Sequence, residues 1–210
     1  MIIQEITAII LTKSAKHRNY CVAGIDCSTG KFVRFVSEDE VTDGALTGSD
    51  LKYWNGDFQA VPLHLVKVKV KAHLKGIHQT ENYLIDRSQK WTFIRKVSLA
   101  DVLELHAPEI HKNIFGNDKE FAFSFNLINI DYSLMLISVN NLKLYTDTDS
   151  GKTKAAFDYN NKHYTNFSVT DNKFFNFEED EFFQAFLVIS ISDKAVPAGM
   201  HYKFIAKIFA

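Results

Sequence analysis

The feature that most constrains the fold is an alternation of apolar and polar residues over positions 65–75. One face carries Val66, Val68, Val70, Ala72 and Leu74, and the other carries Lys67, Lys69, Lys71, His73 and Lys75. Successive side chains of a β-strand point to opposite sides, so a period of two predicts a strand with one buried and one solvent-facing side. The chain therefore needs a sheet that closes over a core.

Further strand-like segments fall into two sets. The first set comprises residues 5–12, 20–26 and 31–37, and the second comprises 121–130, 134–139, 141–146, 154–159, 163–169, 186–191 and 203–210. Residues 38–58 read as a long loop, and the aromatic stretch 174–186 reads as a short helix or loop. Between the sets, Ser98 and Asp101 have the spacing of a helix capping box. This pattern predicts a mainly β protein of two small barrels or sandwiches, at 1–96 and 116–210, joined by a helical connector at 97–115.

The composition is that of a globular protein, since 46% of the 210 residues are hydrophobic and 23% are charged. No apolar run approaches the roughly 18 residues of a membrane helix, and residues 1–11 lack a signal-peptide pattern. We therefore expect a cytoplasmic protein that does not bind membranes. Cys21 and Cys27 are the two cysteines of the chain, which is too few for a disulfide framework. They do not form a C-x-x-C pair, which excludes a zinc ribbon or finger. We expect neither a metal nor a cofactor.

Charge is unevenly distributed along the chain. Residues 1–100 hold 14 basic and 10 acidic residues, a balance of +4, whereas residues 101–210 hold 10 basic and 15 acidic residues, a balance of −5. A protein that binds nucleic acid by bulk charge is strongly basic, and this one has a net charge of −1. Any nucleic-acid contact is therefore expected from a local patch in the first half, unless the imbalance is ordinary scatter.

The lysines of segment 65–75 are the first candidates for that patch. Lys67, Lys69 and Lys71 are spaced about 6.6 Å apart on one strand face, close to the repeat of an extended single-stranded backbone. The alternative is an edge or solvent-facing strand whose charges prevent aggregation.

A second basic group lies in the loop 13–18, where Lys13 and Arg18 could hold a phosphate. Nearby, Phe32 and Phe35 flank Arg34, a combination that can stack bases. The same pattern occurs where aromatic residues are simply buried in a strand.

Catalytic residues are harder to find. Cys21 follows the basic loop, where cations would lower the pKa of its thiol, but the spacing brings no histidine beside it. Segment 147–151 lacks the glutamate that completes a calcium-binding loop. The motifs G-x-x-x-x-G-K-[ST], G-x-G-x-x-G, H-E-x-x-H and G-x-S-x-G are absent. We therefore predict no catalytic residues.

Several segments, in this order along the chain, resemble the dual OB-fold (DuOB) family of prokaryotic proteins. They are residues 13–14, 20–25 (YCVAGI), 30–37 (GKFVRFVS), 81–85 (ENYLI), Trp91, 169–171 (VTD) and 201–208 (HYKFIAKI). The resemblance implies two OB-like barrels and a role in binding nucleic acid or a nucleotide. Carried over by position, it implies these polar motif residues: Lys13, Arg18, Cys21, Arg34, Glu81, Asn82, His201 and Lys203.

Together these observations predict a non-catalytic binding module for single-stranded nucleic acid or a nucleotide, with a basic face on the first barrel. The expected ligand-binding residues are Lys13, Arg18, Arg34, Lys67, Lys69, Lys71, Glu81, Asn82, His201 and Lys203. Tyr20 or Phe32 would offer the stacking surface. One alternative is a protein–protein adaptor that uses β-edges and the aromatics of 174–186. Another is a small nucleotide- or RNA-acting enzyme that uses Cys21 or His201 with Glu81.

Overall fold

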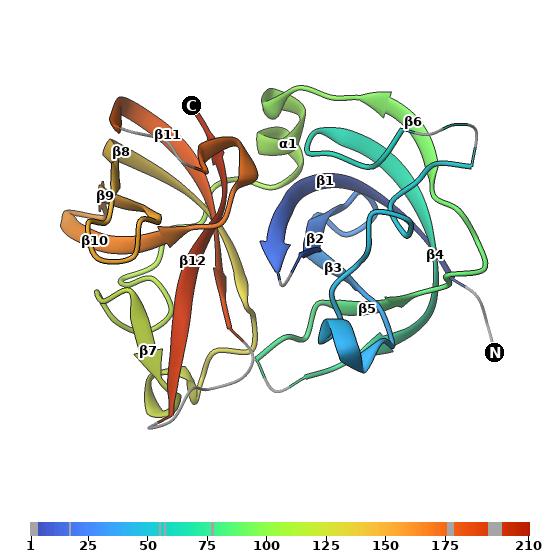
Figure 1. Ribbon diagram of the computed structural model, residues 1–210, viewed down its shortest axis with the longest axis horizontal. Helices are drawn as coiled ribbons and strands as arrows, with labels where there is room; N and C mark the ends of the chain where they lie inside the picture. Colours follow the sequence, from blue (N-terminus) through green and yellow to red (C-terminus); the bar gives the residue numbers. More distant parts are fainter. Residues whose placement is uncertain are drawn as a thin grey trace. The chain divides into compact units, whose positions relative to one another are not determined.

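The computed structural model describes residues 4–16, 18–54, 56, 58–76, 78–175, 179–192 and 199–210. They form two compact units, one from the described parts of 1–76 and 80–107 and the other from 78–79 and 108–210. Each unit is a β-barrel with its own core (Figure 1). The predicted fold class, mainly β with two barrels and a short helix, is confirmed.

The first barrel closes through five strands in the order β1-β2-β3-β5-β4, with β4 pairing back to β1. The β3–β5 pairing is parallel and the others are antiparallel. A sixth strand, β6, adds to β4. The strands are β1 (Gln4–Lys16), β2 (Asn19–Asp26), β3 (Phe32–Val36), β4 (His64–Leu74), β5 (Asn82–Ile85) and β6 (Thr92–Lys96).

Strand β4 is the alternating segment, and its burial follows the prediction over most of its length. Val66, Val68 and Val70 are at most 1% exposed and join the core of the barrel. Trp91 packs edge-on against Phe35 in the same core, with ring centroids 5.1 Å apart. Burial of these apolar side chains is the main force that holds the barrel closed.

The second barrel repeats this strand order. Strands β8-β9-β10-β12-β11 close through the β11–β8 pairing, β10 and β12 run parallel, and β7 adds to β12. Aromatic rings of Phe157, Tyr164 and Phe167 pack together inside it. The strands are β7 (Phe121–Phe123), β8 (Leu134–Thr146), β9 (Thr153–Tyr159), β10 (Lys162–Val169), β11 (Glu179–Ile191) and β12 (Met200–Phe209).

Strand boundaries in the second half differ from the prediction in three places. Residues 134–146 form one strand with a bulge, where Asn141 takes a positive φ of 50°, and not two strands. Strand β7 ends at Phe123 because a 3₁₀ helix, η2 (Ser124–Leu127), follows it. Strand β11 begins at Glu179, so half of the aromatic stretch is strand, while η3 (Asn172–Phe174) is a single turn.

Helical structure is sparse. The predicted capping box is confirmed at the start of α1 (Leu99–Leu105), where Ser98 and Asp101 cap each other's backbone N–H groups. Within the long loop, η1 (Glu40–Thr42) forms a single turn. Across the described part of the chain, no helix combines the length and apolar character needed to cross a membrane.

Gly24 on β2 is required by a close approach to β1. A Cβ atom at this position would lie 2.2 Å from the carbonyl oxygen of Ile9. We expect Gly24→Ala to destabilise the first barrel by about 1–3 kcal/mol, because backbone must move to relieve the overlap. Both tryptophans of the chain, Trp54 and Trp91, belong to this barrel, so urea unfolding followed by tryptophan fluorescence measures the effect.

Gly48→Ala is the control for that variant, since its Cβ would meet the movable end of the Gln59 side chain at 3.0 Å. Equal stability of the two variants would contradict the close-approach argument.

Candidate functional site

The outer face of β4 carries the lysines that the alternation placed there. Lys69 lies opposite Glu5 of β1, and Lys67 lies between Thr7 of β1 and Thr92 of β6. The Glu5 carboxylate accepts hydrogen bonds from both lysines, 3.0 Å from the Lys67 Nζ and 2.9 Å from the Lys69 Nζ. The sheet register therefore builds a cation–anion–cation group on the barrel surface.

Strand β4 is not an edge strand at these positions. Its backbone pairs with β1 on one side and with β6 on the other at Lys67, and the Lys69 carbonyl accepts the backbone N–H of Asp86. Protection of an open edge, one explanation for the lysines, therefore does not apply to Lys67 and Lys69.

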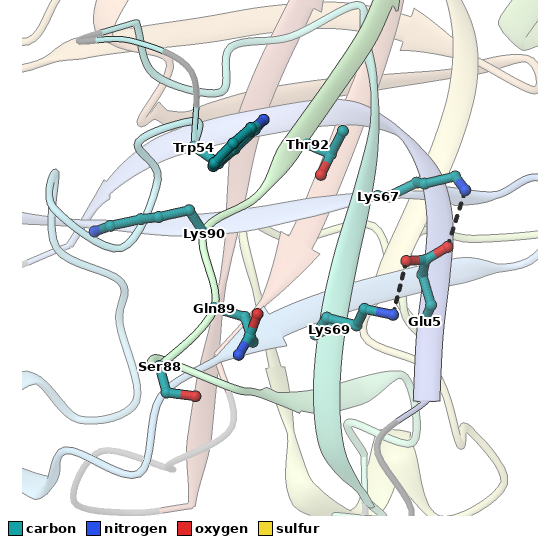
Figure 2. A pocket seen from close by; sticks show the side chains of 8 residues that line it. All are labelled: Glu5, Trp54, Lys67, Lys69, Ser88, Gln89, Lys90 and Thr92. Carbon is teal, nitrogen blue, oxygen red and sulfur yellow. Dashed lines mark ion pairs between the residues drawn. The ribbon is translucent and has the colours of Figure 1, made fainter.

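A depression of about 420 Å³ lies on this face (Figure 2). Its cationic side chains come from β4 and from the loop before β6, and its one aromatic ring comes from the segment between β3 and β4. The lining residues are Glu5, Trp54, Lys67, Lys69, Ser88, Gln89, Lys90 and Thr92. Among the described lining residues, three lysines and one glutamate give a formal charge of +2.

Trp54 reaches the surface because its neighbour is anchored inside the barrel. Tyr53 is 5% exposed, and its hydroxyl hydrogen-bonds the Nδ1 of His64 at 2.7 Å. The Trp54 backbone N–H donates to the carbonyl oxygen of Trp91, which ties the segment to the chain just before β6. Tyr53 forms an isolated β-bridge with Trp91, the chain turns at the next residue, and the Trp54 side chain is 76% exposed.

The loop that holds Ser88, Gln89 and Lys90 is fixed at its first residue. The Asp86 carboxylate accepts hydrogen bonds from the Ser88 backbone N–H at 3.0 Å and from its hydroxyl at 2.7 Å. The Gln89 N–H donates to the Asp86 carbonyl oxygen, and the Lys90 Nζ donates to the carbonyl oxygen of Ser49. The tight turn holds these three residues beside the depression.

Hydrogen bonds from Lys69 and Lys67 hold the pKa of the Glu5 carboxyl below its ordinary value. Glu5 is therefore ionised at neutral pH, and its charge offsets part of the charge of the two lysines. Both lysine side chains remain more than 40% exposed, so water and other anions can reach them.

The row of lysines ends at Lys71. Its Nζ lies 3.3 Å from the Glu38 carboxylate, outside the depression. The β4–β5 pairing shifts register between Val70 and Ala72, and beyond the shift the His73 ring stacks on Tyr83 while Leu74 is 42% exposed. The predicted alternation of faces for residues 72–75 is therefore wrong, because a bulge reverses it.

The predicted loop over residues 13–18 is wrong for residues 13–16, which belong to β1 and pair with β2. Lys13 lies far from the depression, since it follows Glu5 by roughly 26 Å of extended chain. The Lys13 Nζ donates to Gln59 Oε1 at 2.8 Å and lies 4.5 Å from the centroid of the Tyr20 ring. Burial lowers the pKa of Lys13. Arg18 is exposed at the tip of the loop, with a positive φ of 65°.

Three of the motif residues come together on β3 and β5. Arg34 lies opposite Asn82, and its Nη2 donates to Glu81 Oε1 at 3.3 Å. The side chains of Arg34 and Glu81 are 11% and 7% exposed. Phe32, a candidate for base stacking, packs edge-on against His106. These residues form an internal ion pair and an aromatic contact.

His201 and Lys203 belong to β12 of the second barrel. The His201 Nδ1 hydrogen-bonds the carbonyl oxygen of Ser192 at 2.8 Å, and its Nε2 lies 3.2 Å from the Ser124 hydroxyl. Lys203 is 1% exposed, and burial lowers its pKa to about 7. Its Nζ lies within hydrogen-bond distance of oxygens of Ile114, Asn117 and Lys119.

The described residues show no assembled group of catalytic side chains that would support the enzyme hypothesis. Cys21 and Cys27 are half-buried and unbridged, and burial raises the pKa of the Cys27 thiol. Within the described chain, no three His, Cys, Asp or Glu side chains cluster as metal ligands would. Segment 147–151 is a tight turn, closed by a bond from the Gly151 N–H to the Asp147 carbonyl oxygen.

Sequence reasoning missed Trp54, Glu5, Gln89 and Lys90. Trp54 lies in a stretch without regular periodicity, and Glu5 becomes important through its partner 64 positions away in β4. The sequence held one indication that Trp54 has a special role. A tryptophan directly after Tyr53 in an acidic loop is unusual, because large aromatic residues are seldom found in solvent-exposed segments.

The strand order of both units, with the parallel pairing of the third and fifth barrel strands, is that of the five-stranded OB barrel. Residues 6–208 match the model of the dual OB-containing domain family, DuOB. The chain belongs to this family, as its motifs indicated. No curated protein matches it. OB folds commonly bind nucleic acids.

Lys203 is expected to be structural. We predict that Lys203→Met lowers the free energy of unfolding of the second barrel by at least about 2 kcal/mol, because it leaves buried oxygen atoms without a donor. Far-UV circular dichroism during urea unfolding tests this prediction. Lys119→Met, at an exposed position, is the control. A Lys203→Met protein as stable as the wild type would disprove the structural role.

Proposed function

We propose that the first barrel binds single-stranded nucleic acid through the outer face of β4. The observation that carries the proposal is the placement of Lys67, Lys69 and Trp54 around one depression on this face. Cations that follow the backbone, together with an aromatic ring for the bases, are how proteins bind single strands without reading their sequence.

The surface around the depression supports a single strand over a duplex. An exposed indole ring can stack on an unpaired base, whereas the bases of a duplex are already stacked on one another. Lys71 continues the row along β4, and Lys13 near the end of β1 and Arg18 in the turn between β1 and β2 are two further basic residues of this barrel. We assign these five basic residues to the interface, and Arg34, Glu81, Asn82, His201 and Lys203 to internal structure.

The second barrel offers a contrast that favours the first. Its equivalent strand pair, β8 and β11, carries one lysine and two glutamates, with the Lys143 Nζ 2.7 Å from Glu179 and 3.1 Å from Glu181. The signs are the reverse of those of Glu5, Lys67 and Lys69. A negative surface repels phosphates, so the nucleic-acid interface is assigned to the first barrel.

A protein partner is the second candidate, because Phe183 on β11 is 85% exposed and Phe175 is 46% exposed. Apolar docking depends little on salt, whereas nucleic-acid affinity falls as salt rises. Salt titration therefore separates the two functions.

The proposal predicts that Lys67→Glu with Lys69→Glu abolishes binding of a labelled single-stranded oligonucleotide, measured by fluorescence anisotropy. The wild type should bind with an affinity that falls linearly in log salt. Milder replacement by Gln at both positions should reduce the magnitude of the slope by about 0.7 if the two lysines share one phosphate and by about 1.4 if each neutralises its own, because each neutralised phosphate contributes about 0.7.

The matched control is Lys112→Glu with Lys152→Glu in the second barrel, which changes the net charge equally at two exposed positions. If that control weakens binding as much as the β4 variant, the interface is not on β4. Absence of binding by the wild type at low salt would reject the nucleic-acid function and favour the protein partner.

A further inference from the structure

We propose that the depression around Trp54 holds one unpaired nucleotide, whose base stacks on the Trp54 ring and whose phosphate displaces the Glu5 carboxylate from Lys67 and Lys69. This inference rests on the proposed function and adds the unit of ligand that is recognised. It also gives Glu5 a role, as an internal anion that competes with the phosphate.

The size and lining of the depression fit one nucleotide. Its volume of about 420 Å³ lies in the range of small-ligand pockets, which is roughly 300–1,000 Å³. Ser88, Gln89 and Thr92 supply neutral donors and acceptors to the lining, and Figure 2 shows Thr92 between the indole and Lys67. Such groups can hydrogen-bond the edge of a base, and an amide such as that of Gln89 can both donate and accept.

The arrangement in Figure 2 separates the two ends of this ligand. Trp54 lies on one side of the depression, and Lys67, Lys69 and Glu5 lie on the other. A nucleotide has the same polarity, with an aromatic base at one end and an anionic phosphate at the other. Lys90, on the side of Trp54, donates to the Ser49 carbonyl oxygen, and its ammonium group points away from Lys67 and Lys69 in Figure 2.

Glu5 occupies the position where a phosphate would be bound. Its oxygens lie 3.0 and 2.9 Å from two ammonium groups, which is how a phosphate oxygen pairs with lysine. The Glu5 side chain is 34% exposed, so on release it can be solvated by water. Binding is then an exchange of one anion for another, and the fixed carboxylate lowers the affinity for the incoming phosphate.

Two substitutions test the two halves of the proposal, in anisotropy titrations with a fluorescein-labelled 12-residue oligo-dT. We expect Trp54→Ala to weaken binding roughly tenfold, the size of one base–aromatic stack, and Trp54→Phe to retain most of the affinity. We expect Glu5→Gln to strengthen binding about twofold to fivefold, the size of exposed ion pairs that no longer have to be broken. An oligonucleotide with abasic sites should bind wild type and Trp54→Ala equally.

Glu181→Gln is the matched control for Glu5→Gln, because it removes a carboxylate that pairs with a lysine on the second barrel, with the same change of charge. If Glu181→Gln strengthens binding as much as Glu5→Gln, bulk charge explains the effect and the displacement is wrong. If Trp54→Ala binds as the wild type does while the Lys67 and Lys69 variant does not bind, the nucleotide pocket is wrong and the proposed function stands. If the wild type binds no oligonucleotide, both fail.

Discussion

The pairing of β1 with β4 is the interaction on which both the fold and the candidate site of the first barrel depend. It closes the barrel, and through the register of Glu5 with Lys69 it also fixes the charges on the outer face. A shift of one residue would turn the lysines inward and the valines outward, which the burial of Val66, Val68 and Val70 prevents. The hydrophobic core on the inner face therefore specifies the chemistry of the outer face.

The two barrels share a strand order and differ in surface chemistry. Since inner and outer positions alternate along each strand, the outer residues can change without disturbing the packed core. The corresponding strand pairs show this difference. In the first barrel Glu5 pairs with two lysines, and in the second barrel Lys143 pairs with two glutamates. A chain with two barrels of one topology can thus assign ligand binding to one barrel and keep the other for a different contact or for support.

Much of the fold was predictable from the sequence because period-two alternation and turn residues are local signals. The β4 strand and the Ser98 capping box are examples, the two sets of strand-like segments already predicted two barrels or sandwiches, and the family motifs implied that these are OB-like barrels. The features that the sequence did not predict depend on contacts between residues far apart in the chain or on irregular backbone. The bulge after Val70 reverses the faces of β4, and Lys203 meets oxygens far earlier in the chain, as with the Ile114 carbonyl 89 positions away. Trp54 lies in a loop whose position is set by Tyr53 and Trp91, which no local pattern indicates.

An internal anion on a phosphate-binding surface has a physical advantage. Two lysines held about 6.6 Å apart on one strand face repel each other, and a carboxylate between them stabilises the unliganded barrel. Because the pair is exposed, its stabilisation is small, so a polyanion with several phosphates can displace it while a single small anion competes poorly. Glu5 would then select long ligands over free phosphate or mononucleotides. On the proposed function, the site would favour a nucleotide that is part of a strand, which agrees with a row of lysines continuing to Lys71 beyond the depression.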